Sequence, residues 1–148
     1  MKNSFFNNNG PFKFKEILNQ LNLQNDKNNE DLIINDINDL QNSNSNEITF
    51  FHSKKYKIIA NITKASFCIT TENLKNELPK QCIAIIVDNV LVSTAIVTSM
   101  FYPNSIKDDF DDTVNDINKT EFNNKVKYGK NVLIGQNVSI GKNCLIGH

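Results

Sequence analysis

The chain has 148 residues, 16 lysines, no arginine and 16 acidic residues, so its formal net charge is zero. This length leaves room for one small domain and little more, and the lack of arginine and of net positive charge argues against nucleic acid as a partner. The three cysteines, Cys68, Cys82 and Cys144, are odd in number and far apart, which argues against a disulfide framework and a metal site and favours a cytoplasmic protein.

The N-terminal part is expected to begin with a flexible lead, residues 1–11, and then to alternate helices with short strands. A helix is predicted from Phe12 to Leu23, where apolar residues recur at helical spacing along one face. The next predicted elements are strands over 32–37 and 48–51 and a helix over 54–63.

The most apolar run of the chain lies between Cys82 and Tyr102. Its first part, residues 82–87, is β-branched and bounded by turn residues, as a buried strand is, and from Leu91 the period becomes helical. Asp88 lies inside the run, where an unpaired carboxylate would be costly in a bilayer, so no membrane span is predicted. With a further strand over 66–70, the pattern predicts an α+β fold class whose N-terminal domain, residues 12–103, is a small α/β layer.

Acidic residues then replace aliphatic ones. Residues 104–124 contain five aspartates and few apolar side chains. Such a shift in composition predicts an acidic linker and a domain boundary.

Residues 125–148 contain a six-residue repeat. The two apolar columns of the repeat are Tyr128, Ile134, Ile140, Ile146 and Val126, Val132, Val138, Cys144. A six-residue period is typical of a parallel β-helix, in which a small residue such as glycine helps to turn each corner. The alternative is a pair of hairpins built on Gly-Gln-Asn and Gly-Lys-Asn.

One triangular coil takes about 18 residues, so the repeat completes little more than one coil. A single coil cannot bury its own core, because solenoids need several stacked units and a cap. We therefore expect this sequence to be the front piece of a longer protein.

A small α/β domain that leads into hexapeptide repeats, with the segment Ile48-Thr49-Phe50-Phe51-His52-Ser53-Lys54-Lys55-Tyr56 near its middle, resembles the UDP-3-O-acylglucosamine N-acyltransferases of lipid A biosynthesis. The resemblance covers nearly all of residues 12–148. Its specific parts are the opening helix, the Ile-Thr-Phe segment followed by Lys-Tyr, the strand Ala65–Thr70, Val87-Asp88-Asn89 before a helix, and the repeats. It implies that residues 12–103 bind uridine and that residues 125–148 begin a left-handed parallel β-helix of a homotrimer.

The resemblance also implies site residues. Phe50 and Tyr56 match the aromatic pair that sandwiches uracil in the family, although from the residues alone both would be interpreted as core aromatics. Ser53 stands where the family often has an asparagine that contacts uracil, and its hydroxyl supplies only part of that hydrogen bonding. His52 is expected at the surface or at the rim of the pocket, and contact with the substrate phosphates is the alternative for this residue.

The implied reaction is transfer of a 3-hydroxyacyl chain from acyl carrier protein to the 2-amine of UDP-3-O-acylglucosamine, with a histidine as general base and no cofactor. His148 follows Ile146-Gly147 in a setting similar to that of the family's catalytic histidine. In the family, however, that histidine lies many coils further along. The resemblance therefore implies that these 148 residues carry no catalytic residue, and that the fragment alone is inactive.

Two alternatives stay open at this stage. The chain could be a non-catalytic module that binds a nucleotide and oligomerises through its repeats, or a hexapeptide acyltransferase for another nucleotide sugar. In each case the expected location is the cytoplasm or the periphery of the inner membrane.

Overall fold

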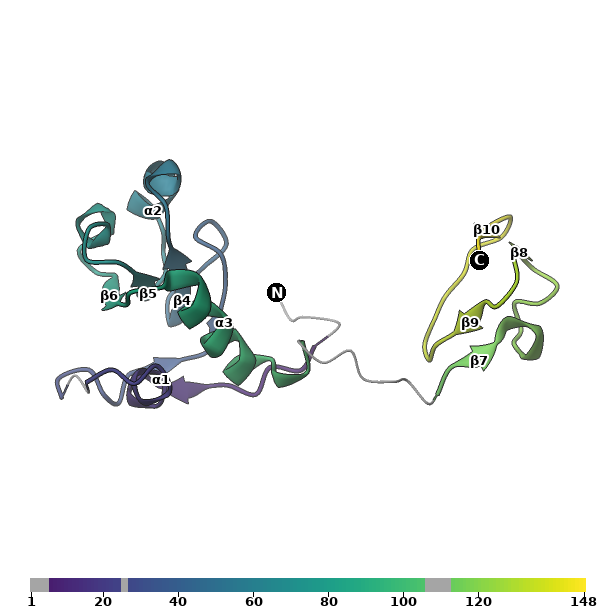
Figure 1. The fold of residues 1–148 in the computed structure, drawn as a ribbon, viewed down its shortest axis with the longest axis horizontal. Helices are drawn as coiled ribbons and strands as arrows, with labels where there is room; N and C mark the ends of the chain where they lie inside the picture. Colours follow the sequence, from purple (N-terminus) through teal and green to yellow (C-terminus); the bar gives the residue numbers. More distant parts are fainter. Residues whose placement is uncertain (1–5, 25–26, 106–112) are drawn as a thin grey trace. The chain divides into compact units, whose positions relative to one another are not determined.

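The computed structural model describes residues 6–24, 27–105 and 113–148, which fall into two compact units, Met1–Lys107 and Asp108–His148 (Figure 1). Residues 1–5 of the predicted lead and 106–112 of the predicted linker lie outside the described residues. Within the described ranges, none of the helices is long and apolar enough to cross a membrane.

The first unit is a mixed α/β fold built on a four-stranded parallel sheet. The strands lie side by side in chain order and are β3 (Asp36–Ile37), β4 (Glu47–Phe51), β5 (Phe67–Thr70) and β6 (Ile83–Ile86). Because the strands are parallel, each connection returns along a face of the sheet. The helical segments between and after the strands are η1 (Lys54–Tyr56), α2 (Lys57–Asn61), η2 (Lys75–Glu77), α3 (Val90–Phe101) and η3 (Pro103–Ser105).

Helices cover both faces of this sheet, and Figure 1 shows α1 (Phe14–Gln20) and α2 on opposite sides of it. Side chains alternate along a strand, so Phe67 and Ile69 of β5 enter a core shared with α1 and α3, whereas Cys68 enters a second core shared with α2. The strands predicted at 48–51, 66–70 and 82–87 and the helix predicted from Leu91 are confirmed, each with its ends shifted by no more than a residue or two.

The predicted helix over 12–23 is too long at both ends. Phe12–Lys13 forms β1, which pairs antiparallel with β2 (Ile33–Ile34), and α1 begins only at Phe14, where the backbone N–H of Lys13 donates to a Glu16 carboxylate oxygen at 2.6 Å. At the other end Asn22 takes a left-handed conformation, with φ of 56°. Pairing with a distant strand therefore outweighs the helical period of the first two residues.

The segment predicted as a flexible lead is held to the first unit where the structure describes it. The backbone N–H of Asn9 donates to the carbonyl of Phe101 at 2.8 Å, and the side-chain amide of Asn8 donates to the carbonyl of Asn35 at 3.1 Å. Residues 6–11 thus connect to the end of α3 and to the loop before β3, which the local sequence does not predict.

The second unit contains β7 (Asn115–Asp116), η4 (Ile117–Lys119), β8 (Lys127–Tyr128), β9 (Leu133–Ile134) and β10 (Leu145–Ile146). Its core consists of Ile117, Phe122, Val126, Val132 and Ile134, with Tyr128, Ile140, Cys144 and Ile146 packed against it. Residues 115–124, predicted as linker, therefore supply a strand and two core side chains, because Ile117 and Phe122 are apolar residues within an otherwise polar stretch.

In the repeat, β8 and β10 pair in parallel. Leu145 lies opposite Lys127, an offset of 145 − 127 = 18 residues, and Ile146 lies opposite Tyr128. The backbone N–H groups of Lys127 and Gly129 donate to the carbonyls of Cys144 and Ile146, at 3.1 and 2.9 Å. Since hairpins would pair neighbouring repeats antiparallel, the hairpin interpretation of this segment is wrong. Val138 departs from its predicted column, being exposed rather than buried.

The corners of the repeat are formed by asparagine rather than by glycine, which corrects the sequence expectation. Asn131, Asn137 and Asn143, six residues apart, have φ of 59°, 57° and 61°, whereas no glycine of the described ranges has a positive φ. Asparagine tolerates the left-handed region because its short side chain can hydrogen-bond to the nearby backbone. Gly129 has a different role: a Cβ there would lie 2.9 Å from Nδ1 of His148, so the glycine allows the chain to approach itself.

Candidate functional site

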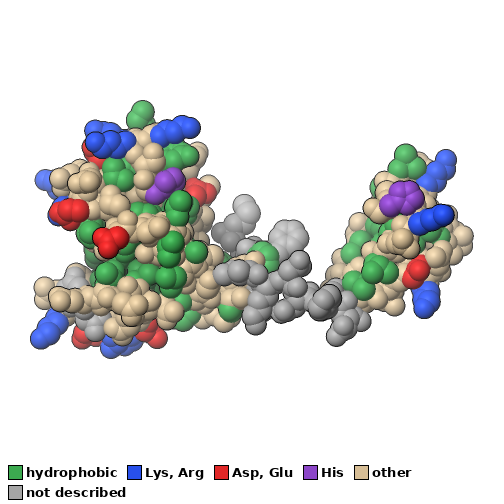
Figure 2. Space-filling model, in the orientation of Figure 1, with side chains coloured by type: hydrophobic (Ala, Val, Ile, Leu, Met, Phe, Trp, Pro, Cys, Tyr) green, Lys and Arg blue, Asp and Glu red, His purple; other side chains and the backbone are tan. Residues whose placement is uncertain are grey.

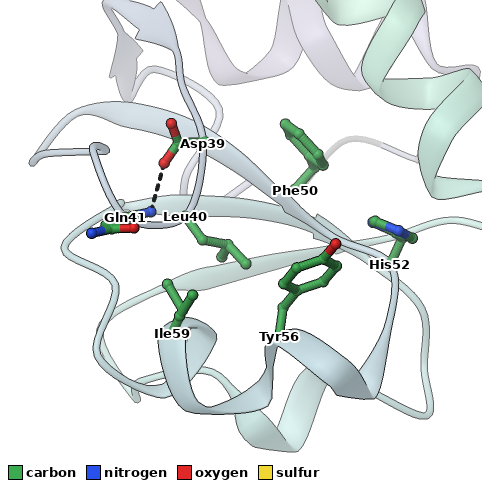
Figure 3. Close-up of a pocket in the computed structure, with 7 residues that line it drawn as sticks. All are labelled: Asp39, Leu40, Gln41, Phe50, His52, Tyr56 and Ile59. Atoms are coloured by element: carbon green, nitrogen blue, oxygen red, sulfur yellow. Dashed lines mark hydrogen bonds between the residues drawn. The ribbon is translucent and has the colours of Figure 1, made fainter.

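A pocket of about 290 Å³ lies beyond the carboxyl ends of β3 and β4 (Figure 3). In open α/β sheets this edge is where ligands bind, because the loops that leave the strands can open apart there. The pocket lies at the lower limit of typical ligand pockets and so suits one flat ring system better than a complete nucleotide sugar. Its lining residues are Asp39, Leu40, Gln41, Phe50, His52, Tyr56 and Ile59.

The aromatic residues of the pocket come from one short segment of the chain. Phe50 belongs to β4 and packs against the core under α1 and α3, so its ring is held on one side by the protein. Tyr56 ends η1 and is 39% exposed, which leaves much of its ring open to a ligand. Figure 3 shows Tyr56 and Ile59 rising from the helical segment, with Phe50 and His52 on the side of β4.

The ring of His52 lies beside that of Tyr56. The two rings lie with their centroids 5.6 Å apart at an angle of 49°. His52 is exposed and follows directly on β4, so its imidazole lies at the rim rather than at the base of the pocket. This position is open to a polar group that extends from a ligand ring into solvent.

Asp39 organises the loop after β3. Its carboxylate accepts hydrogen bonds from the backbone N–H groups of Gln41 and Asn42 at 2.8 and 2.9 Å, and from the Asn42 side-chain amide at 2.7 Å. The hydrogen bond from the Asn42 side chain in particular lowers the pKa of Asp39 from its ordinary value. The backbone carbonyl of Asp39 also accepts from Ser43, so Leu40 and Gln41 are presented on a closed turn.

The structure brings together three of the five residues to which the sequence drew attention. Phe50, His52 and Tyr56 line one pocket. Ser53 is not among the lining residues, because its hydroxyl caps η1 by accepting from the backbone N–H of Lys55 at 3.4 Å. His148 belongs to the second unit, where its Nδ1 accepts from the backbone N–H of Lys130 at 3.0 Å.

Four lining residues were missed by the sequence prediction. Ile59 shares the predicted helical face with Tyr56, so the period of residues 54–63 contained a usable signal. Asp39, Leu40 and Gln41 come from a loop after β3. Its Asp-x-x-Asn pattern indicates a turn, but it does not indicate which other segments of the chain lie beside that turn. Only the pairing of β3 with β4 places that loop beside Tyr56.

The lining is suited to contact with an apolar or aromatic ring. Apolar and aromatic side chains form most of the lining, and the carboxylate of Asp39 is already occupied by three donors. Rings of the Phe and Tyr type bind flat bases by stacking, worth roughly 1–3 kcal/mol per base.

Fold and site together define a small α/β domain of open parallel-sheet type with a pocket beyond the carboxyl ends of two of its strands. Residues 31–100 match the family model described as LpxD: UDP-3-O-(3-hydroxymyristoyl) glucosamine N-acyltransferase. Over this region the chain belongs to the LpxD family of acyltransferases, as the resemblance indicates.

Curated relatives carry the same family name. The chain is 31% identical over 104 residues to the UDP-3-O-acylglucosamine N-acyltransferase of Rickettsia akari (strain Hartford), a match that spans 69% of this chain. It is 32% identical over 101 residues, 67% of this chain, to the protein of the same name from Rickettsia canadensis (strain McKiel). In both cases the chain spans about 30% of the length of the relative.

Proposed function

We propose that the chain is the uridine-recognition portion of an acyltransferase. The complete protein would move a 3-hydroxyacyl group from acyl carrier protein to the 2-amine of UDP-3-O-acylglucosamine, in the cytoplasmic steps of lipid A biosynthesis. The observation that carries the proposal is the pocket at the ends of β3 and β4, in which Phe50, His52 and Tyr56 meet. Family membership over residues 31–100 supplies the chemical class of the ligand.

In this proposal, uracil enters the pocket and stacks on Tyr56, with Phe50 on its other side. Apolar contacts from Leu40 and Ile59 complete the walls. His52 at the rim contacts the phosphates that leave the pocket toward solvent. Ser53, with its hydroxyl directed to the backbone of η1, takes a smaller part in recognition.

For the second unit, we propose the first coil of a left-handed parallel β-helix that forms the trimer of the whole enzyme. The 18-residue offset between β8 and β10 and the left-handed asparagines every six residues support this proposal. The catalytic histidine would then lie in later coils, and His148 would serve the contact with Lys130 instead. Accordingly, the 148-residue chain should transfer no acyl group from acyl carrier protein.

The experiment that tests the proposed site is calorimetric titration with UDP. Tyr56→Ala removes the exposed stacking surface and should weaken UDP binding about 5- to 150-fold. Ile58→Ala is the matched control, because Ile58 lies on the same helical segment, is 82% exposed and does not line the pocket. Equal UDP affinity in the wild type and in Tyr56→Ala would refute the site.

The two alternatives are a nucleotide-binding module and an acyltransferase for another nucleotide sugar. Acyl-transfer assays of the complete protein distinguish them from this proposal. If acyl transfer to UDP-3-O-acylglucosamine occurs, both alternatives fail. If UDP binds at Tyr56 but the complete protein acylates another UDP-sugar, the pocket assignment stands and the substrate assignment does not.

A further inference from the structure

The outer side of α2 carries an exposed apolar pair. Ile58 of α2 and Ile62, which directly follows the last residue of α2, are 82% and 72% exposed, and their i, i+4 spacing places them on one side of this turn of the chain. Single exposed apolar residues are common on protein surfaces. Two aliphatic side chains with this exposure, four positions apart, form a small exposed apolar surface. Their neighbour Ala60 is fully buried, so the segment is anchored from its inner side.

Lysines surround this apolar pair. Residues 48–71 contain four lysines and no acidic residue, although the chain as a whole has no net charge. Figure 2 shows lysine side chains on both sides of the apolar atoms at the top of the first unit, where Figure 1 places α2. The four lysines are Lys54, Lys55, Lys57 and Lys64.

Most of this positive charge is uncompensated. Lys57 forms an ion pair with Glu77 at 2.9 Å. Across the described ranges, no acidic group lies within ion-pair distance of Lys54, Lys55 or Lys64. Their ammonium groups are therefore available to an anionic partner, while their methylene stems can lie along an apolar surface.

We propose that Ile58, Ile62 and the lysines around them, which we call the α2 patch, bind the surface of an anionic lipid bilayer. The two isoleucines would enter the boundary between headgroups and acyl chains, and the lysines would contact lipid phosphates. The shape of the patch favours a bilayer over a folded protein, because α2 lies at the end of the unit (Figure 1) and its two isoleucines project into solvent with basic side chains on both sides. Ile59 faces the pocket from the same helix, so a docked patch would leave the pocket open.

The test is co-sedimentation of the 148-residue chain with vesicles. Vesicles that mix phosphatidylglycerol with phosphatidylcholine should bind the chain at low salt, and vesicles of phosphatidylcholine alone should bind it far less. Lys54→Gln and Lys55→Gln should each lower the partition coefficient about 5-fold, and raised salt should act in the same direction. Ile58→Ser combined with Ile62→Ser should lower it at least 10-fold at constant charge.

The matched control is Leu91→Ser combined with Val92→Ser, which removes two apolar residues of 56% and 54% exposure from α3. Because both residues lie outside the lysine-rich segment 48–71, this control should bind vesicles like the wild type. An equal loss of vesicle binding in the control and in the isoleucine variant would overturn the proposal. Wild-type binding that is the same with and without phosphatidylglycerol would overturn it as well. Because vesicle binding is measured without nucleotide, its failure is independent of UDP binding at Tyr56.

Discussion

The two units of the molecule bury their cores in different ways. In the first unit, helices cover both faces of a sheet, and large residues such as Phe51, Phe67 and Phe101 are no more than 1% exposed. In the second, Ile117 is 1% exposed, but Phe122, Val126, Val132 and Ile134 keep 8–9% of their surface exposed, and among residues 113–148 the parallel pairing is limited to the two-residue strands β8 and β10. Layers of helix and sheet complete a core locally, whereas a six-residue repeat completes one only by stacking.

The largest expected effect is a cavity in the first unit. Phe67→Ala removes a ring that packs on Phe14, with ring centroids 5.0 Å apart, and should cost roughly 3–5 kcal/mol of unfolding free energy in that unit. Native-state hydrogen exchange measures the loss at the amides of β4 and β5. Amides of the second unit serve as the internal reference, and an equal loss of protection there would contradict a self-contained first core.

A smaller effect is expected at the corners of the second unit. Asn137→Ala places alanine, which has no polar side chain to hydrogen-bond locally, in the left-handed region. The substitution should lower the free energy of unfolding of the second unit by roughly 1–2 kcal/mol. Asn137→Gly should be close to neutral, because glycine adopts that conformation freely. Exchange of the Lys127 and Gly129 amides, which donate to Cys144 and Ile146, reports the change. If the alanine and glycine variants protect these amides equally, the left-handed conformation at Asn137 does not limit the stability of the second unit.

Loss of the N-terminal cap of α3 should lower the free energy of unfolding by about 1 kcal/mol. The side-chain oxygen of Asn89 accepts from the backbone N–H of Val92 at 3.1 Å and caps the helix. Asn89→Ala removes this acceptor, while Asn89→Asp keeps it and should retain the wild-type stability in urea unfolding. Equal stability of the alanine and aspartate variants would show that the cap contributes nothing.

The smallest effect concerns the pH dependence of the pocket loop. Since hydrogen bonds from Asn42 and Gln41 lower the pKa of Asp39, this carboxylate stabilises the folded state above its unfolded pKa and loses that contribution as pH falls through the folded pKa. A carboxyl-detected NMR titration should therefore place its pKa below the ordinary value. Asn42→Ala should raise it, and an unchanged pKa in that variant would contradict the role of the Asn42 amide.

Much of the first unit could be predicted from the sequence. The runs at 48–51, 66–70 and 82–87 are short and apolar, and the helical period from Leu91 is long, so local pattern and tertiary structure agree. The helix predicted over 12–23 failed at its ends, because Phe12–Lys13 pairs with Ile33–Ile34, a contact that no local pattern contains.

The site was predictable to the same extent. Phe50, His52 and Tyr56 lie within seven positions of one another, so a single segment and its family resemblance sufficed to bring them together. The loop from Asp39 to Gln41 enters the pocket through strand order, which a single sequence does not reveal. In the tail, the six-residue period was visible, but the choice of Asn131, Asn137 and Asn143 as corners depends on backbone conformation.

NMR titration of the 148-residue chain with UDP shows whether uracil binds in the pocket beyond β3 and β4. We expect saturable shifts of the amides of residues 39–41 and 50–59 and of the ring signals of Phe50 and Tyr56, with the second unit unaffected. Saturable shifts confined to residues 113–148, or none at all at millimolar UDP, would contradict this expectation.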